Sequence, residues 1–399
     1  AKILIHTRKD ELDAALAGYA EISSERPKRA NAEWWLMTSE LAAALFRAGR
    51  LEEALDILPH VVNLAPTEEQ RADAMLRTAE GQIALRKTTE AVDSLETFKK
   101  AFPQRPEIVP VLIRLAELLR ETNNPLTAAQ YFADVVAHEK APIGFRYRAA
   151  ISRGWCLREA GRLEDATKAF LEGEELGLTK PQQARGVFLA ADTAFGIANY
   201  KEAAALYARA ADTYPDTEYA EEARFRQGRS LFELKDFRQA AVTYKAFLDQ
   251  FPDSILTEEA QLEHGIALRQ GASARDEYLA AVAELRHFAE AYPDSKHTPR
   301  ALMEGYEAAM GAADTDTAIA LLSAVIAKDK QAELYPHALY HRAMVQFRTG
   351  KQDEAVADAV LFVERYGDLP LAPDIMLQLG DYYANSGDKK IHEQAGFEG

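Results

Sequence analysis

An alanine recurs along almost the whole chain at an interval of about 37 residues. It occupies positions Ala15, Ala54, Ala91, Ala128, Ala166, Ala203, Ala240, Ala281, Ala318 and Ala355, and six of the nine intervals are 37 residues. Self-similarity at a fixed period of this length is the sequence signature of a repeat architecture. We therefore expect the 399-residue chain to be a stack of similar small units, each containing one of these marker alanines.

The segment 213–254 indicates that each unit is a pair of helices. Apolar residues follow helical spacing over 218–233, a polar break follows at Lys235 and Asp236, and a second amphipathic run extends to Phe251. Pro252 ends this run because proline has no amide hydrogen to continue a helix. Asp253 and Ser254 are then expected to cap the next helix.

Residue size also repeats with the marker alanines. A small residue usually stands twelve positions upstream: Ala42, Ala79, Ala116, Gly154, Ala191, Gly228 and Ala343. A large residue stands four positions downstream: Tyr19, Leu58, Leu95, Phe132, Phe170, Tyr207, Tyr244, Leu285 and Leu322. We expect the small residues to let paired helices approach and the large ones to fill the space between units.

This order of small residue, alanine, large residue and proline resembles the tetratricopeptide repeat over roughly residues 10 to 387. The turns AGRLEEA (48–54), AGRLEDA (160–166) and TGKQDEA (349–355) are similar to the turn inside that repeat. The resemblance implies an all-α fold, a right-handed superhelical solenoid of antiparallel helix pairs. We predict one continuous solenoid over 1–387 with about ten repeats, the first and last incomplete, and an irregular tail over 388–399.

The unit is about three residues longer than the usual tetratricopeptide repeat of about 34 residues. The surplus lies at the junctions YPDT (214–217), FPDS (251–254) and YPDS (292–295), which resemble the repeats of bacterial cell-envelope proteins of the BamD and YbgF type. This resemblance implies a periplasmic or cell-envelope location, with the cytoplasm as the alternative. Membrane association would then use a partner or a lipid anchor outside this sequence, because the chain has no apolar stretch of about 18 residues.

Composition and motifs argue against several functional classes. The net charge of −16 repels phosphate backbones, so we expect no nucleic-acid partner. Cys156 is the single cysteine and stands in an expected first helix, so we interpret it as a core residue and not as a nucleophile. His337 and His341 lie one helical turn apart without a third ligand, and no glycine-rich phosphate loop or GxSxG motif occurs. We predict no metal, no cofactor and no catalytic site, although a dispersed serine–histidine–aspartate arrangement is left open.

The tetratricopeptide resemblance also implies a binding groove. In that family the second, fifth, ninth and twelfth positions of each first helix face the concave side of the superhelix. Aromatic rings and arginines together suit an extended or helical peptide. The predicted partner-binding residues are Arg148, Trp155, Arg158, Arg185, Phe188, Asp192, Phe195, Phe225, Arg229 and Phe232. The competing interpretation is that Trp155, Phe188 and Phe225 pack in the core, because aromatic residues at helical spacing are usually structural.

The sequence thus predicts a non-enzymatic scaffold that binds a protein or peptide partner in its concave groove, with a bacterial envelope assembly as its expected setting. One alternative is the repeat region of a larger enzyme or sensor whose catalytic domain lies outside this chain. Another is a self-assembling array. The long interval between Ala240 and Ala281 is expected to add about four residues to a turn, over 269–279, as either a contact loop or a tolerated insertion.

Overall fold

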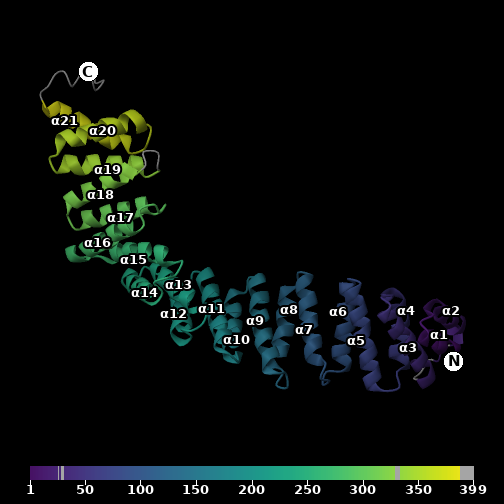
Figure 1. The fold of residues 1–399 in the computed structure, drawn as a ribbon. Helices are drawn as coiled ribbons and strands as arrows, with labels where there is room; N and C mark the ends of the chain where they lie inside the picture. Colours follow the sequence, from purple (N-terminus) through teal and green to yellow (C-terminus); the bar gives the residue numbers. More distant parts are fainter. Residues whose placement is uncertain (26, 28–30, 329–332, 387–399) are drawn as a thin grey trace. The chain divides into compact units, whose positions relative to one another are not determined.

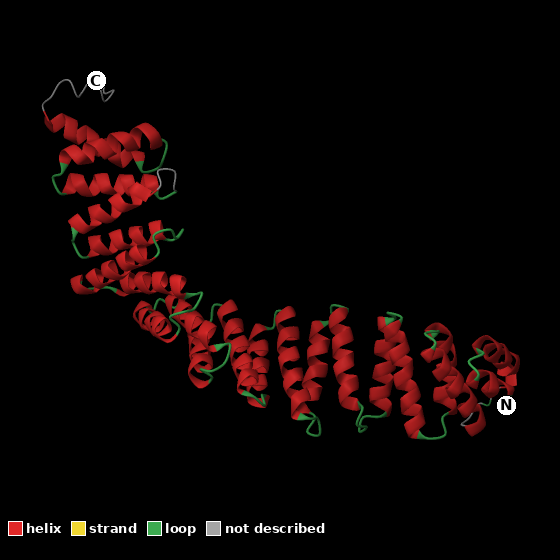
Figure 2. Ribbon diagram, viewed as in Figure 1, coloured by secondary structure: helices red, strands yellow, loops and turns green. Residues whose placement is uncertain are grey.

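The computed structural model describes residues 1–25, 27, 31–328 and 333–386. Within these residues every regular element is a helix and none is a strand (Figure 2). Successive helices form hairpins and pack mainly against their neighbours along the chain. The fold is an α-solenoid, as predicted. The predicted irregular tail at 388–399 lies outside the described residues.

The chain divides into two compact halves, Ala1–Ile197 and Ala198–Gly399. The N-terminal half, Ala1–Ile197, contains eleven α-helices and one 3₁₀ turn in its described part (Figure 1). They are α1 (Lys2–Arg8), α2 (Leu12–Ile22), η1 (Ser23–Glu25), α3 (Ala32–Arg47), α4 (Leu51–Leu64), α5 (Glu68–Ala84), α6 (Thr88–Ala101), α7 (Ile108–Glu121), α8 (Pro125–Ala137), α9 (Ile143–Glu159), α10 (Leu163–Leu176) and α11 (Lys180–Gly196).

The C-terminal half, Ala198–Gly399, continues the same alternation of first and second helices through its described residues. They are α12 (Tyr200–Thr213), α13 (Ala220–Glu233), α14 (Phe237–Gln250), α15 (Thr257–Gly271), α16 (Arg275–Ala291), α17 (Thr298–Gly311), α18 (Thr315–Lys328), α19 (Tyr335–Arg348), α20 (Gln352–Tyr366) and α21 (Ala372–Ser386).

The ten marker alanines are all fully buried. Each has 0% of its surface exposed. In nine of the ten helices that carry a marker alanine, it is the fourth residue of the helix; the exception is Ala281 in α16. Only a methyl group fits where the two helices of a hairpin meet, and this explains the period that the sequence displays.

Where glycine stands upstream, the large residue of the second helix packs against it inside the same hairpin, whereas the sequence pattern predicted that the large residue lies between units. A Cβ atom at Gly228 would lie 2.8 Å from Cε1 of Tyr244, and one at Gly154 would overlap the ring of Phe170. In the hairpin of α15 and α16 the partner of Leu285 is Gly265, whose added Cβ would lie 2.7 Å from Leu285 Cδ2. This glycine precedes Ala281 by sixteen positions and not twelve, because the hairpin is four residues longer.

The turn inside nine hairpins has one conformation. The residue five positions before the marker alanine has a positive φ, between 55° and 76°. These residues are Asp10, Gly49, Arg86, Asn123, Gly161, Ala198, Lys235, Ala313 and Gly350. Within each half, the left-handed residue reverses the chain in few residues, as in the αL end of many helices.

The tenth hairpin departs from this turn, and the prediction of a lengthened loop over 269–279 is wrong. Only Ala272–Ala274 connect α15 to α16, while α16 begins six residues before Ala281 instead of three. The four extra residues of this hairpin therefore lengthen the helices and not the loop. Glu277 stabilises the added turn, since its carboxylate accepts hydrogen bonds from the backbone N–H groups of Ser273 (2.7 Å) and Ala274 (3.2 Å).

The prediction that Asp253 and Ser254 cap the next helix is wrong, because the N-cap of α15 is Leu256 and no side chain caps that helix. The junction serine instead joins successive first helices. Ser254 Oγ accepts a hydrogen bond from the N–H of Leu256 at 3.0 Å and donates to Glu221 of α13 at 2.5 Å. Ser295 repeats the arrangement with the N–H of His297 and the carboxylate of Glu258 in α15.

The α13 helix begins at Ala220, two residues later than predicted. In the described part of the chain, the length and apolarity needed to cross a bilayer are not reached by any helix.

Candidate partner-binding surfaces

Two of the ten predicted partner-binding residues are buried. Phe188 has 8% of its surface exposed and Phe225 has 6%. Phe225 makes edge contacts with the rings of Tyr244 and Phe247, both 5.7 Å away between centroids. For these two side chains the core interpretation holds, and burial removes them from any surface that a partner could contact.

Three other predicted residues meet on one surface of the N-terminal half. The guanidinium of Arg158 lies 4.9 Å from the ring centroid of Trp155, and its Nη1 lies 3.3 Å from Oδ2 of Asp192 in α11. Trp155 and Arg158 are three residues apart in α9 and so share one face of the helix. The side chains of Arg158 and Asp192 are 29% and 28% exposed. We call Trp155, Arg158 and Asp192 the α9–α11 surface.

The remaining predicted residues are spread over three helices. Arg148 and Arg185 are exposed on α9 and α11, and Phe195 near the end of α11 is half-buried. In the C-terminal half, Arg229 is exposed on α13, and the half-buried Phe232 stacks edge-on against Phe237 at 5.0 Å. They stay predictions, because exposure alone does not identify a contact with a partner.

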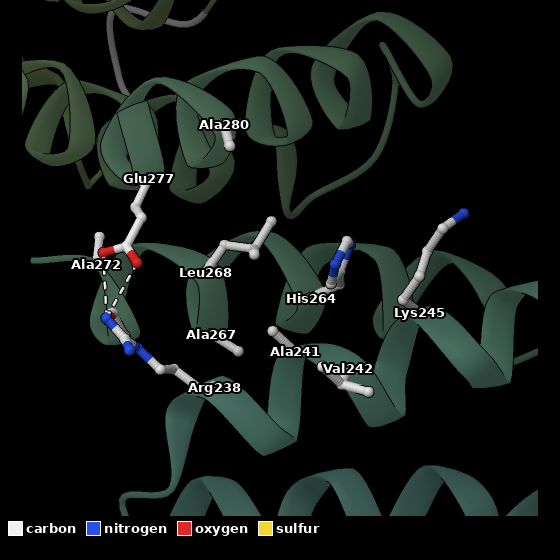
Figure 3. A pocket seen from close by; sticks show the side chains of 11 residues that line it. Arg238, Ala241, Val242, Lys245, His264, Ala267, Leu268, Ala272, Glu277 and Ala280 are labelled. Atoms are coloured by element: carbon white, nitrogen blue, oxygen red, sulfur yellow. Dashed lines mark hydrogen bonds and ion pairs between the residues drawn. The ribbon is translucent and has the colours of Figure 1, made fainter. Parts of the chain in front are cut away.

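A pocket of about 430 Å³ lies between α14 and α16, over α15, and sequence reasoning missed it (Figure 3). Arg238, Ala241, Val242 and Lys245 of α14 form one wall, and Glu277 and Ala280 of α16 form the other. The floor consists of His264, Ala267, Leu268 and Gly271 of α15 with Ala272. We call this pocket the α14–α16 groove.

The α14–α16 groove lies on the far side of α15 from the predicted concave face. His264, Leu268 and Gly271 follow each other at helical spacing on one side of the helix. The fifth and ninth positions of this first helix, Leu262 and Ile266, point roughly the opposite way, since each residue adds about 100° of rotation. The groove is therefore a surface that the family resemblance did not predict.

Sequence models of the tetratricopeptide repeat match four segments of the chain, residues 73–105, 113–177, 222–254 and 307–362. The chain contains tetratricopeptide repeats. No curated protein is significantly similar to it in sequence.

Three solved structures with some likeness to this array are distant in sequence, and their TM-scores are below 0.5. The structure of Naa15/Naa10 bound to HypK-THB is 15% identical, with a TM-score of 0.48, and the match covers 99% of this chain and 64% of that one. A tetratricopeptide repeat protein from Parabacteroides merdae is 13% identical, with a TM-score of 0.36 over 68% of this chain and 98% of that one. YrrB, described as a TPR protein with an unusual peptide-binding site, is 20% identical, with a TM-score of 0.34 over 51% of this chain and 96% of that one.

Other tetratricopeptide repeats of the chain form similar but smaller grooves between second helices. One lies between α16 and α18 and has a volume of about 340 Å³. Another lies between α4 and α6 and has a volume of about 300 Å³, with Asp93, Ser94 and Thr97 on one wall. Grooves of this kind thus follow from stacking, and the α14–α16 groove is larger than these two.

One pocket lies on the face that the tetratricopeptide resemblance assigns to the concave side. It has a volume of about 290 Å³ between α3 and α5. Leu36, Ser39 and Ala43 at the second, fifth and ninth positions of the α3 repeat line it, together with Asp73 and Arg77 of α5. None of these residues was among the predicted contacts.

The titratable residues singled out in the sequence are held by packing. Cys156 is fully buried, as expected, and burial raises the pKa of its thiol to about 11, so the thiolate is disfavoured. His341 Nδ1 lies 3.2 Å from the hydroxyl of Tyr306, and burial lowers the pKa of its imidazole, with repulsion from His337 adding to the effect. Among the described residues no group of three or more His, Cys, Asp or Glu side chains could hold a metal ion.

Proposed function

We propose that this chain is a non-enzymatic scaffold that binds a protein or peptide partner through the α9–α11 surface. The observation that carries the proposal is the contact of Arg158 with both the Trp155 ring and the Asp192 carboxylate. Tetratricopeptide repeats form an interaction scaffold, and this surface combines the residue types that contribute most to binding energy at interfaces.

The surface can exchange its internal contacts for contacts with a partner. Arg158 and Asp192 are each more than a quarter exposed, and an exposed ion pair contributes at most about 1 kcal/mol. Its loss on binding is therefore a small cost. A partner carboxylate could bond to Arg158, while an apolar or aromatic partner side chain would cover the exposed part of Trp155.

The test is affinity capture from the organism that makes this protein, with wild-type chain and two charge-reversal variants. Arg158→Glu removes the cation from the α9–α11 surface. Lys168→Glu makes the same change on α10, where the side chain of Lys168 is 77% exposed. A protein retained by wild type and Lys168→Glu but lost with Arg158→Glu supports the proposal. Equal capture by both variants, each shown to be folded by circular dichroism, contradicts it.

We propose the bacterial cell envelope as the setting, and this rests on the junctions YPDT, FPDS and YPDS alone. The net charge of −16 supports a protein partner over a nucleic acid. Detection of the native protein in the periplasmic or membrane fraction after cell fractionation would agree with a location in the cell envelope. Its recovery only with cytoplasmic markers would refute it.

A further inference from the structure

The α14–α16 groove contains an aliphatic side chain that its position in the repeat does not explain. Val242 follows its marker alanine by two positions and is 62% exposed. The corresponding positions of the other nine hairpins hold Ala17, Asp56, Asp93, Gln130, Lys168, Ala205, Ala283, Ala320 and Ala357. A solvent-facing valine thus stands where the other repeats have a small or polar residue.

The centre of the groove is a socket, a hollow lined by aliphatic side chains. Ala241, Ala267 and Ala280 leave space around Leu268, and together with Val242 they form an aliphatic surface in a volume of about 430 Å³ (Figure 3). That volume is within the range of sites that enclose a ligand group. Covering this surface with an apolar side chain would release water from both partners.

The charges of the groove favour an acidic partner. Arg238 and Lys245 lie seven residues apart on the α14 wall, with side chains 65% and 59% exposed. The single lining carboxylate, Glu277, is already bonded to Arg238 and to the N–H groups of Ser273 and Ala274. Glu277 has little capacity left for a basic partner. Arg238 also bonds to Gly271 and Ser273 through Nε and Nη2, so Lys245, held by one exposed pair with Asp249, is the more available cation.

The floor also contains a buried polar atom without a hydrogen bond. His264 is 8% exposed, and its Nδ1 lies 3.4 Å from Glu284 without hydrogen-bond geometry. This end of the groove, beside Lys245, is therefore less tightly bonded than the end closed by Arg238 and Glu277. A partner that excludes water here would strengthen the interaction between His264 and Glu284.

From these features we propose that the α14–α16 groove is a second docking site, which takes an acidic amphipathic helix by inserting one leucine-sized side chain beside Val242. Acidic residues on the flank of that helix next to α14 pair with Arg238 and Lys245. The groove would thus add a second class of partner contact to the scaffold, independent of the α9–α11 surface.

The probe is a synthetic alanine-based helix of about 18 residues with one central leucine. Glutamates three positions before and one position after the leucine fall on one flank of the helix, and glutamines occupy the other flank. Fluorescence anisotropy of the labelled peptide with the full chain should show saturable binding. Replacing the peptide leucine by alanine, or its glutamates by lysines, should weaken binding at least about tenfold.

Two protein variants distinguish insertion of the peptide leucine into the socket from unspecific binding of the peptide to an apolar surface. Val242→Asp removes the aliphatic wall, and Ala280→Leu fills the socket while adding apolar surface. Both should weaken binding at least about tenfold. The controls are Ala320→Asp and Ala320→Leu, because Ala320 is exposed at the repeat position of Val242 in α18 and lines the smaller groove. These controls should leave the affinity unchanged.

The proposal is overturned if the peptide does not saturate the protein below about 1 mM, or if Ala280→Leu binds it as well as or better than wild type. Equal binding of the leucine and alanine peptides overturns it too. Arg158→Glu, which tests the α9–α11 surface, should not change peptide binding. Failure of either proposal is therefore distinguishable from failure of the other.

Discussion

Single glycines set how closely the helices of this array approach. At Gly154 in α9 an added methyl group would overlap the ring of Phe170 in α10, so Gly154→Ala must displace the ring or the helix. Overpacking of this kind costs about 1–3 kcal/mol of the free energy of unfolding. Urea denaturation would measure it.

The same helix provides the control for that substitution. A Cβ atom at Gly144 would have no other atom within 4 Å, apart from its chain neighbours and its own helix backbone. Gly144→Ala should therefore keep or raise stability, by up to about 1 kcal/mol, because alanine is the better helix former. Equal losses for the two variants would show that the contact with Phe170 does not decide the cost.

A second prediction at the residue scale concerns pH. The imidazole of His341 has a lowered pKa in the folded chain, mainly because of burial, against 6.5 for a free histidine. The unfolded chain therefore takes up a proton in a pH range in which the folded chain does not. Above about pH 6.5 this group does not lower the free energy of unfolding. As the pH falls from there through the lowered pKa, the free energy of unfolding decreases by about 1.4 kcal/mol for each unit between the unfolded and folded pKa values.

Replacing His341 by glutamine removes this proton uptake. We expect His341→Gln to show a smaller loss of stability than wild type between pH 7 and pH 5, measured as the difference in free energy of unfolding at the two pH values. The contact of the neutral ring with Tyr306, at 5.1 Å between centroids, would be lost at every pH and shifts both values equally. An unchanged pH dependence would mean that other groups govern acid sensitivity.

At the scale of the element, the turn inside each hairpin permits a matched pair of substitutions. Gly161 has a φ of 73° and Ala313 a φ of 55° at the same position of two repeats. A β-carbon in this region costs about 1–2 kcal/mol, so Gly161→Ala should destabilise by that amount. Ala313→Gly should stabilise by up to about 1 kcal/mol, since the relief of strain exceeds the added freedom of the unfolded chain.

Thermal unfolding of the two turn variants tests both predictions, the loss of stability in Gly161→Ala and the gain in Ala313→Gly. The opposite substitutions serve as each other's control, because each changes one methyl group in the same turn. Stabilisation by both, or destabilisation by both, would contradict a turn governed by the left-handed residue.

The elements were predictable where a repeated local rule fixes them. The marker alanines act within one hairpin and the proline-containing junctions between two, and both are visible as a period in the sequence. The added turn of α16 broke the rule through one interaction, the capping of Ser273 and Ala274 by Glu277. That interaction belongs to this hairpin and not to the repeated pattern, so no period in the sequence could reveal it.

The candidate sites were less predictable because they depend on how three helices meet. Phe188 and Phe225 occupy positions that the family resemblance assigns to a groove, yet they are buried, since neighbouring helices cover them. The α14–α16 groove depends on small residues from three helices, which no local pattern brings together. Val242 alone carried a readable signal, as a branched apolar residue at an exposed position of the repeat.

At the scale of the whole molecule, contacts run between helices that are close in the chain, so damage should spread only locally. Phe362 in α20 is 0% exposed and its ring lies 5.9 Å from those of Tyr340 and Tyr366. Phe362→Ala should cost about 3–5 kcal/mol of the free energy of unfolding. We expect α19, α20 and α21 to open while distant repeats stay folded.

Hydrogen–deuterium exchange with mass spectrometry tests this directly. Phe362→Ala should abolish amide protection in α19–α21 and leave α13–α15 of the same half protected as in wild type. The matched change is Phe98→Ala in α6, where a phenylalanine that is also 0% exposed is removed from the other half. Its loss of protection should centre on α5–α7. If either substitution instead exposes the whole chain at one rate, the array unfolds as a single cooperative body, because the coupling between repeats then exceeds the stability of each one.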